Sequence, residues 1–289
     1  MLRSLLDSAS LPTPNSKPYP YVVIKNALPD SLCDRLIASY PSYEMMGVND
    51  AKSNSRWHYE TCQVRANDGI APEWKEVIDY FSSQTFFDVC IDLFSDSITQ
   101  LYPHIAANKE ELRKLRVGVK GIDDYNHCDV LLEAAIAGNT PVTEPSSVRV
   151  NHIDKPRKLL SGLLYLREDD DDSTGGDLFI RQFKKDYTQR KKNSCYRAVY
   201  VSENHTDLVE TVNYEKNVLV LFVNSLESFH GVTVRNPTKY RRIFINIVCE
   251  LQKPVFKFPN NFLCLMSRLL LSSSAIKSRF SRIASHNYE

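Results

Sequence analysis

The sequence predicts an α+β fold in which helices from the N-terminal third pack outside a β-sandwich. Two observations support this prediction: apolar residues recur at helical spacing before residue 100, and short apolar runs separated by turn-like segments follow one another after about residue 130. The 15 Tyr and 13 Phe also favour strands. At 289 residues, the chain suits a single domain with extensions.

The N-terminal elements are each predicted from a local pattern. Residues 1–18, which are rich in Ser and Pro, are expected to form an extended arm, and the stretch that follows predicts a strand over Tyr19–Ile24. Three helices are expected next. The first begins at Pro29, the second carries Trp74 on an apolar stripe with i, i+3, i+4, i+7 spacing, and the third is capped by Ser83.

Short runs within the segment from about residue 130 to 250 are predicted to be the strands of the core. They are Ser147–His152, Leu159–Leu166, Asp177–Arg181, Tyr196–Val201, Leu208–Val212, Val218–Val223 and Arg242–Glu250. Strands at such short spacing are typical of a sandwich or barrel, so residues 19–255 are expected to form one domain. Residues 256–289 carry Leu, Met, Arg and Ser at roughly helical spacing. They predict a basic helical extension that either docks on its own sheet or contacts a partner or a membrane surface.

The composition narrows the class of protein. The formal net charge is +1, so no global field favours nucleic acid as a partner. The seven Cys are widely spaced and include no C-x-x-C, which argues against a disulfide framework or a thiolate zinc site and favours a reducing, cytoplasmic location. No signal peptide is expected, because the first residues contain no long apolar run. No transmembrane segment is expected either, because the longest apolar run, Val218–Val223, is too short to span a bilayer.

A metal site is predicted from His and Asp residues spaced two apart. On a strand, such a pair points to one face, so both side chains can bind the same ion. A distant His completes a set of two imidazoles and one carboxylate, which suits iron(II) with open coordination positions. The H-x-D pattern occurs three times, starting at His127, His152 and His205, so at least two of the occurrences are accidental.

The context of the three patterns favours His152 and Asp154. His152 ends an alternating run that begins at Ser147, and an apolar strand follows the bend after Asp154. The alternatives, His127 and His205, lie in polar, turn-like segments.

The distal ligand is expected at His230. This residue follows the buried strand Val218–Val223 and a short polar turn, and it precedes Gly231, so it is well placed to face a cavity. By itself, His230 would be interpreted as a core histidine bonded to a backbone carbonyl.

Six segments in this part of the chain resemble the 2-oxoglutarate/Fe(II)-dependent dioxygenase superfamily, in its prolyl-4-hydroxylase-like branch. In chain order they are Asn151–Asp154, Leu163–Leu166, Gly175–Leu178, Val218–Val223, Phe229–Val232 and Arg241–Phe244. Each is unspecific alone, but their order and spacing match the family's pattern. The opening Pro18–Ile24 also resembles uncharacterised bacterial and phage members. The resemblance implies a double-stranded β-helix, a jelly-roll or cupin-like core of eight strands in two sheets, with iron between them.

The resemblance also implies where 2-oxoglutarate binds. The family holds the distal carboxylate with Arg or Lys about ten residues past the distal His, so Arg241 and Arg242 are the candidates, and Arg suits a bidentate grip. Strand alternation favours Arg242. With Arg242 in the cavity, Asn246 also faces it and can meet polar ligand atoms, whereas Ile243 and its aliphatic neighbours face the helices.

Two further residues near the site have competing interpretations. Tyr165 falls where some family members place a tyrosine hydroxyl against the same carboxylate, and packing in the core is the alternative. Arg235 also lies near the distal His, but it is expected on an exposed turn with a surface role.

The resemblance implies a hydroxylase that uses Fe(II), 2-oxoglutarate and O2, with ascorbate as an optional cofactor, and that releases succinate and CO2. Asp154 fills the position at which halogenating relatives bind chloride, so hydroxylation is expected. Peptidyl proline, a free amino acid, and a sugar or lipid intermediate all stay open as substrates. The alternatives are a non-enzymatic cupin-like module that binds a metal or ligand, and a scaffold in which His152 and His230 are core residues.

Overall fold

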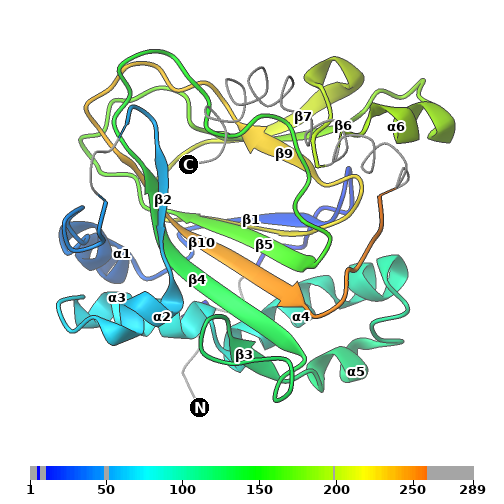
Figure 1. Ribbon diagram of the computed structural model, residues 1–289, viewed down its shortest axis with the longest axis horizontal. Coiled ribbons are helices and arrows are strands. Elements are labelled where there is room, and N and C mark those ends of the chain that lie inside the picture. Colours follow the sequence, from blue (N-terminus) through cyan, green and yellow to red (C-terminus); the bar gives the residue numbers. More distant parts are fainter. Residues whose placement is uncertain (1–4, 7–10, 49–51, 198, 259–289) are drawn as a thin grey trace, which may run out of the picture.

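The computed structural model describes residues 5–6, 11–48, 52–197 and 199–258. Within them, two β-sheets face each other, and the helices of the N-terminal third lie against the outer side of the larger sheet (Figure 1). Every described strand pairing is antiparallel except that of β3 with β4. The chain is therefore a mixed α/β protein with mostly antiparallel sheets. None of the described helices combines the length and apolarity needed to cross a membrane.

The larger sheet has seven strands in the order β1-β8-β5-β10-β4-β2, with β3 paired to β4 beside this path. In chain order these strands are β1 (Tyr21–Lys25), β2 (Arg56–Tyr59), β3 (Val117–Val119), β4 (Val130–Asn139), β5 (Lys158–Tyr165), β8 (Val218–Val223) and β10 (Arg242–Leu251). Sequence-distant strands are thus neighbours, and β10 lies between β4 and β5 at the centre.

The smaller sheet has three strands in the order β7-β6-β9. Its members are β6 (Leu178–Phe183), β7 (Thr206–Val212) and β9 (Phe229–Val232), and β6 is joined to β7 through the helix α6 (Gln189–Cys195) and the 3-10 turn η1 (Glu203–His205). In Figure 1 this sheet lies opposite the larger one, so residues on the inner faces of both sheets share one interior.

The helices on the outer side are α1 (Asp30–Ala38), α2 (Thr61–Ala66), α3 (Pro72–Phe81), α4 (Gln84–Leu101) and α5 (Lys109–Arg113). Three of them, α1, α3 and α4, are the helices expected from the sequence. Their starts follow the expected chemistry, because Pro72 stands in the first turn of α3 and the Ser83 side chain accepts a hydrogen bond from the Phe86 amide at the start of α4.

Alternation along the strands separates two cores. On β10, Ile243, Ile245 and Ile247 join the main core with the helices, whereas Phe244 joins a second core between the sheets. Arg242 and Asn246 share the parity of Phe244 and therefore point into the space between the sheets. This is the alternation that the sequence predicts for the strand.

Two predicted strands are wrong. Residues 147–152, and residues 196, 197 and 199–201, form at most isolated bridges rather than strands, and the chain at 189–195 is helical. The central strand β4 was not predicted, because its middle is rich in Ala and Gly, which have low strand propensity. Small residues are needed there: a Cβ at Gly138 would lie 2.6 Å from the Trp57 ring.

The two ends of the chain are described only in part. Near the N-terminus, Leu6 is buried in the main core, and Asn15 pairs with Tyr21 at the start of β1. Of the helical extension expected over residues 256–289, only 256–258 are described, where the Phe258 ring lies 6.2 Å from that of Tyr196. The rest of that prediction lies outside the described residues.

Candidate metal centre

The segment before Asp154 is held against β9 by its backbone, and this contact brings two histidines together. The amide of His152 donates to the carbonyl of His230 at 2.9 Å, and the amide of His230 donates back to the carbonyl of His152 at 2.9 Å. Residues paired in this way lie directly opposite each other, with both side chains on the same face. The two imidazole rings are accordingly 4.3 Å apart between centroids.

Asp154 reaches the same point from the segment that leads into β5. Its Oδ2 atom accepts a 2.7 Å hydrogen bond from Ser161 on the inner face of β5 and lies 4.0 Å from Nε2 of His230. Its Oδ1 atom lies 3.0 Å from Nζ of Lys158. One ligand atom from each of His152, Asp154 and His230 falls within 4.8 Å of the others, and this is the only such group among the described residues.

Backbone carbonyls fix the orientation of both imidazoles. Nδ1 of His152 lies 2.9 Å from the carbonyl oxygen of Val150, and Nδ1 of His230 lies 2.8 Å from that of Ser228. Because a carbonyl only accepts, each Nδ1 carries the proton and each Nε2 presents a lone pair. Metal-ligating histidines are commonly held by a partner of this kind.

The charge states also suit a metal. Burial lowers the pKa of His152 to about 3, and the neighbouring His230 adds to the effect. Burial lowers the pKa of His230 as well. Burial would raise the pKa of Asp154, but Lys158, the two imidazoles and the Ser161 hydroxyl together hold it well below its usual range. Near neutral pH, the site therefore offers two neutral imidazoles and one carboxylate, the donor set expected for iron(II).

A second polar group lies between the sheets around Arg242, which is 1% exposed. Its Nε donates to the carbonyl of Gly176 at 2.7 Å, and its Nη1 makes a long contact of 3.4 Å with Oδ1 of Asn139. The guanidinium lies over the rings of Tyr165 and Phe244, at 4.9 and 4.8 Å from their centroids. Cation–π contacts of this length support a buried charge without neutralising it.

The turn beneath Arg242 depends on two glycines. Gly175 and Gly176 have φ of +79° and +84°, and a Cβ on Gly175 would lie 1.8 Å from the carbonyl oxygen of Val234. No other residue type fits this backbone at Gly175. The pair therefore places the Gly176 carbonyl against Arg242.

Several buried polar atoms on β2, β4, β5 and β10 have no hydrogen-bond partner among the described residues. They are Nη2 of Arg242, the hydroxyl of Tyr165, Nδ2 of Asn139 and Nε of Arg56. Buried polar atoms are nearly always paired in folded proteins, so a group of unpaired ones indicates a missing ligand. Burial raises the pKa of Tyr165, so its hydroxyl keeps its proton and can donate. Nη2 of Arg242, Nδ2 of Asn139 and the Tyr165 hydroxyl are donors around one guanidinium, and together they suit a carboxylate, which only accepts.

The other two candidate arginines have different partners. Arg241 pairs with Glu168 at 3.0 Å and lies over the ring of Tyr40, so it does not face the space between the sheets. The prediction that Arg235 lies on an exposed turn is wrong, because its side chain is buried and only 1% exposed. The turn-like residues around it predicted exposure, but its guanidinium is needed inside to satisfy acceptors from three separate segments.

The alternative H-x-D pairs lie elsewhere. The His127 ring is exposed and contacts Asp124 at 3.1 Å, and the His205 ring contacts the Tyr187 hydroxyl at 3.1 Å. Neither belongs to a group of potential metal ligands among the residues described.

Sequence reasoning missed several residues that shape the site. Ser161 and Lys158 contact Asp154, and Arg56 donates to Oδ1 of Asn246 at 3.0 Å. The run Arg56-Trp-His-Tyr alternates polar and aromatic residues, which is a strand pattern. Four residues are too few for a firm prediction, however, and strand pairing between distant segments is not readable from local sequence.

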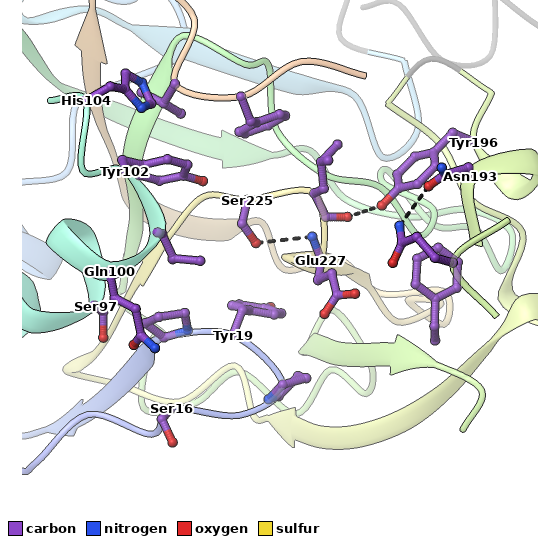
Figure 2. A pocket seen from close by; sticks show the side chains of 18 residues that line it. Ser16, Tyr19, Ser97, Gln100, Tyr102, His104, Asn193, Tyr196, Ser225 and Glu227 are labelled. Atoms are coloured by element: carbon purple, nitrogen blue, oxygen red, sulfur yellow. Dashed lines mark hydrogen bonds between the residues drawn. The ribbon is translucent and has the colours of Figure 1, made fainter. Parts of the chain in front are cut away.

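A cavity lies beside the turn that follows β8. It has a volume of about 720 Å³ and is lined by α4, α6 and the turn at 225–227, without His152, Asp154 or His230 (Figure 2). Tyr102 in its wall donates to the carbonyl of Asn224, whose side-chain amide donates to Ser161 at 2.9 Å. The wall of this cavity therefore supports the residue that orients Asp154.

Comparisons with known proteins give a fold likeness only. No family model and no curated protein matches the chain. Among solved structures, it is similar to a Pseudomonas putida prolyl-4-hydroxylase, with 16% identity over 81% of this chain and 93% of that chain and a TM-score of 0.40. It is also similar to a Trichoplax adhaerens prolyl hydroxylase in complex with a hypoxia inducible factor oxygen degradation domain peptide fragment. The identity is 14% over 80% of this chain and 84% of that chain, and the TM-score is 0.44. A third similar structure is a rice dioxygenase for auxin oxidation, with 10% identity over 81% of this chain and 74% of that chain and a TM-score of 0.40. Similarity this low carries no argument about activity, which must be inferred from the residues of the site.

Proposed function

We propose that this chain is an iron(II)- and 2-oxoglutarate-dependent oxygenase of the double-stranded β-helix type that hydroxylates an unactivated C–H bond. The observation that carries the proposal is the convergence of His152, Asp154 and His230 in the interior that also holds Arg242. Two oriented imidazoles and one carboxylate leave coordination positions open for a co-substrate and O2. Bound iron(II) would supply the O2 chemistry, and the protein supplies position, charge and exclusion of water.

The spacing of the two polar groups supports 2-oxoglutarate as co-substrate. Ser161, which contacts Asp154, and Tyr165, which packs on Arg242, share the inner face of β5 four residues apart. This corresponds to about 13 Å along the strand. Side chains that reach inward from both ends shorten the gap to the scale of a five-carbon dicarboxylate. Arg242 and the Tyr165 hydroxyl would hold its distal carboxylate, and His152, Asp154 and His230 would hold the metal that takes the keto-acid end.

Each residue has a defined part in this arrangement. His152 and His230 stay neutral and hold the metal through Nε2, while Asp154 stays ionised because Lys158 and Ser161 stabilise its charge. Asp154 also fills the position that a halide would need, so the reaction proposed is hydroxylation, with 2-oxoglutarate converted to succinate and CO2. Fe(II), 2-oxoglutarate and O2 are thus the proposed requirements.

The test is turnover of 2-oxoglutarate without added substrate. Purified protein with Fe(II), 2-oxoglutarate and O2 should release succinate slowly, and Asp154→Gly should abolish the release. A protein that binds iron stoichiometrically but forms no succinate, even with a broad panel of candidate substrates, would be a cupin-like binding module instead. A chlorinated product from the unmodified protein would contradict hydroxylation.

A further inference from the structure

Arg56 presents a second cation to the interior between the sheets. It lies opposite Asn139 in the pairing of β2 with β4, on the same face as Arg242 and Phe244. Its guanidinium lies 5.3 Å from the centroid of the Phe244 ring, and its Nη2 donates to Oδ1 of Asn246 at 3.0 Å. Its Nε is buried without an acceptor. No described carboxylate forms an ion pair with Arg56, so its charge is not neutralised.

Arg149 lies in the segment that leads to His152, and its backbone is bonded to β9. Its carbonyl accepts a 2.8 Å hydrogen bond from the amide of Val232, two residues beyond His230 on β9. Its side chain is half-buried, and neither an ion pair nor a hydrogen bond joins its guanidinium to any described residue. The following residue, Val150, is 49% exposed, so the segment that carries Arg149 lies at the surface of the protein.

The charges that face Arg56 are mostly of its own sign. Burial, together with the charges of Arg149 and Arg242, lowers the pKa of Arg56 to about 9, and the acid that opposes them is Asp154. Asp154 is committed to the metal, and the distal carboxylate of the co-substrate would neutralise Arg242. Arg56 and Arg149 are then left without an anion.

The remaining acids in this part of the interior do not supply one. Glu133 and Glu250 pair with Lys120, at 3.2 and 3.6 Å between Nζ and the carboxylate oxygens. Two arginine side chains kept unpaired at the edge of a buried site are costly unless a ligand brings the missing charge.

We propose that Arg56 and Arg149 bind an oxyanion of the substrate that is hydroxylated, so that the substrate is a small organic acid with a carboxylate or phosphate near the reacting carbon. This inference rests on the proposed function and names its substrate class. Guanidinium groups suit either oxyanion, because both accept two parallel N–H bonds. Neutral sugars and unmodified lipid chains are excluded as substrates by the same argument.

The test uses Mn(II) in place of Fe(II), with N-oxalylglycine occupying the co-substrate site so that no turnover occurs. Calorimetric titrations with N-acetylglycine, methyl phosphate and the neutral N-acetylglycinamide then measure oxyanion binding. We expect one or both oxyanions to bind and the amide not to bind. Arg149→Gln and Arg56→Gln should each weaken oxyanion binding by about tenfold to a hundredfold. The matched control is Arg113→Gln, which removes an exposed arginine of α5 far from the interior.

The competing assignment is that both arginines hold the co-substrate. In that case, Arg56→Gln and Arg149→Gln would weaken N-oxalylglycine itself and leave the oxyanions unchanged, which would overturn the inference. Binding of N-acetylglycinamide as tightly as the acid, or no binding of either oxyanion, would also overturn it. Arg56→Lys, which keeps the charge, separates lost recognition from a damaged fold.

The same experiment distinguishes a failure of the proposed function from a failure of this inference. If N-oxalylglycine does not bind to the Mn(II)-loaded protein, the co-substrate assignment is wrong. The same oxyanion titrations on the Mn(II) protein alone then still decide whether Arg56 and Arg149 bind an anion.

Discussion

Arg235 and Arg242 lie in neighbouring regions of the interior and are both 1% exposed, yet their surroundings differ. Nη1 of Arg235 donates to Oδ1 of Asn54 at 3.0 Å and to the carbonyl of Thr140 at 2.9 Å, and its Nη2 donates to the carbonyl of Tyr240 at 3.0 Å. Arg242 has one short bond, one long contact and an unpaired Nη2. We call a guanidinium saturated when its N–H groups have hydrogen-bond acceptors within the protein, as in Arg235, and unsaturated when some do not, as in Arg242. A saturated guanidinium stabilises the loops that it joins, whereas an unsaturated one can still bind an anion.

The same difference occurs within each histidine of the metal centre. Nδ1 of His152 and Nδ1 of His230 are both satisfied by backbone carbonyls, whereas neither Nε2 atom forms a hydrogen bond with a described residue. The hydrogen-bonded Nδ1 atoms fix the orientation of the rings, and the Nε2 atoms, which lack a hydrogen bond, mark where a ligand can bind. The predictions below test this distinction, from the largest effect to the smallest.

Removing a ligand atom should have the largest effect. His152→Ala and His230→Ala should each abolish iron binding in anaerobic dialysis with metal analysis, because two remaining protein ligands do not retain the ion. Both proteins should stay folded, as monitored by circular dichroism. His127→Ala is the control and should keep full iron stoichiometry. Full stoichiometry in either of the first two variants would move the metal site elsewhere.

Removing the unsaturated arginine should mainly affect the co-substrate. Arg242→Ala should raise the apparent KM for 2-oxoglutarate by roughly a hundredfold, because removing one partner of a buried ion pair costs on the order of 3–5 kcal/mol. Arg241→Ala should be much milder, since Arg241 pairs with Glu168. A titration of succinate release against 2-oxoglutarate measures both values. The reverse ranking would show that the strand parity has been misassigned.

Removing the saturated arginine should instead affect stability. Arg235→Ala leaves three buried acceptors without their donor, which costs about 3 kcal/mol, or about 6–12 °C in Tm. The KM for 2-oxoglutarate of the folded fraction should stay within about twofold of that of the unmodified protein. Thermal unfolding and steady-state kinetics on the same preparation test this prediction. A large rise in KM without a loss of Tm would erase the distinction between the two arginines.

Acid should destabilise the metal-free protein through the unsaturated histidines. In the unfolded chain, a histidine takes up its proton near pH 6.5, whereas folded His152 resists protonation until about pH 3. The unfolded state therefore binds more protons between these values, and stability falls as the pH is lowered from about 6.5 toward 3. Asp154 contributes only at the acidic end of this window and below it, because its folded pKa is depressed and the unfolded carboxyl takes up its proton near pH 3.8.

The measurement is Tm against pH in the presence of a chelator. His152→Asn should flatten part of the slope between pH 6.5 and 4, and His230, whose pKa is also lowered, should account for a further part. A Tm that does not change over this range in the unmodified protein would contradict the buried, neutral state of the two rings.

Local pattern was enough to predict several elements of the fold. The strand Val218–Val223 was predicted with its observed bounds, and helix α4 begins after the predicted Ser83 cap. The central strand β4 was missed, because its Ala and Gly residues are selected by close packing against Trp57 rather than by strand propensity. The strand predicted over 147–152 is wrong, because within it only His152 forms bridges, to Tyr200 and His230, and these do not extend into a ladder.

For the candidate site, too, local sequence predicted some residues and missed those whose role depends on distant parts of the chain. Spacing and context predicted His152 and Asp154, the family resemblance added His230, and the structure brings the three side chains together. Arg56 and Arg149 were not identified, because their importance lies in what surrounds them. Whether an arginine is saturated, like Arg235, or left unpaired depends on carbonyls and carboxylates that come from distant parts of the chain, and no local pattern reports this.

The most direct test of the central claim is anaerobic calorimetry of 2-oxoglutarate binding to the Fe(II)-loaded protein, compared with Arg242→Ala, Arg235→Ala and His230→Ala. We expect one molecule to bind per chain in the unmodified protein and in Arg235→Ala. Binding should be about a hundredfold weaker in Arg242→Ala and undetectable in His230→Ala. Equal affinity in all four proteins would mean that 2-oxoglutarate does not bridge the metal and Arg242, and the proposed site would be wrong.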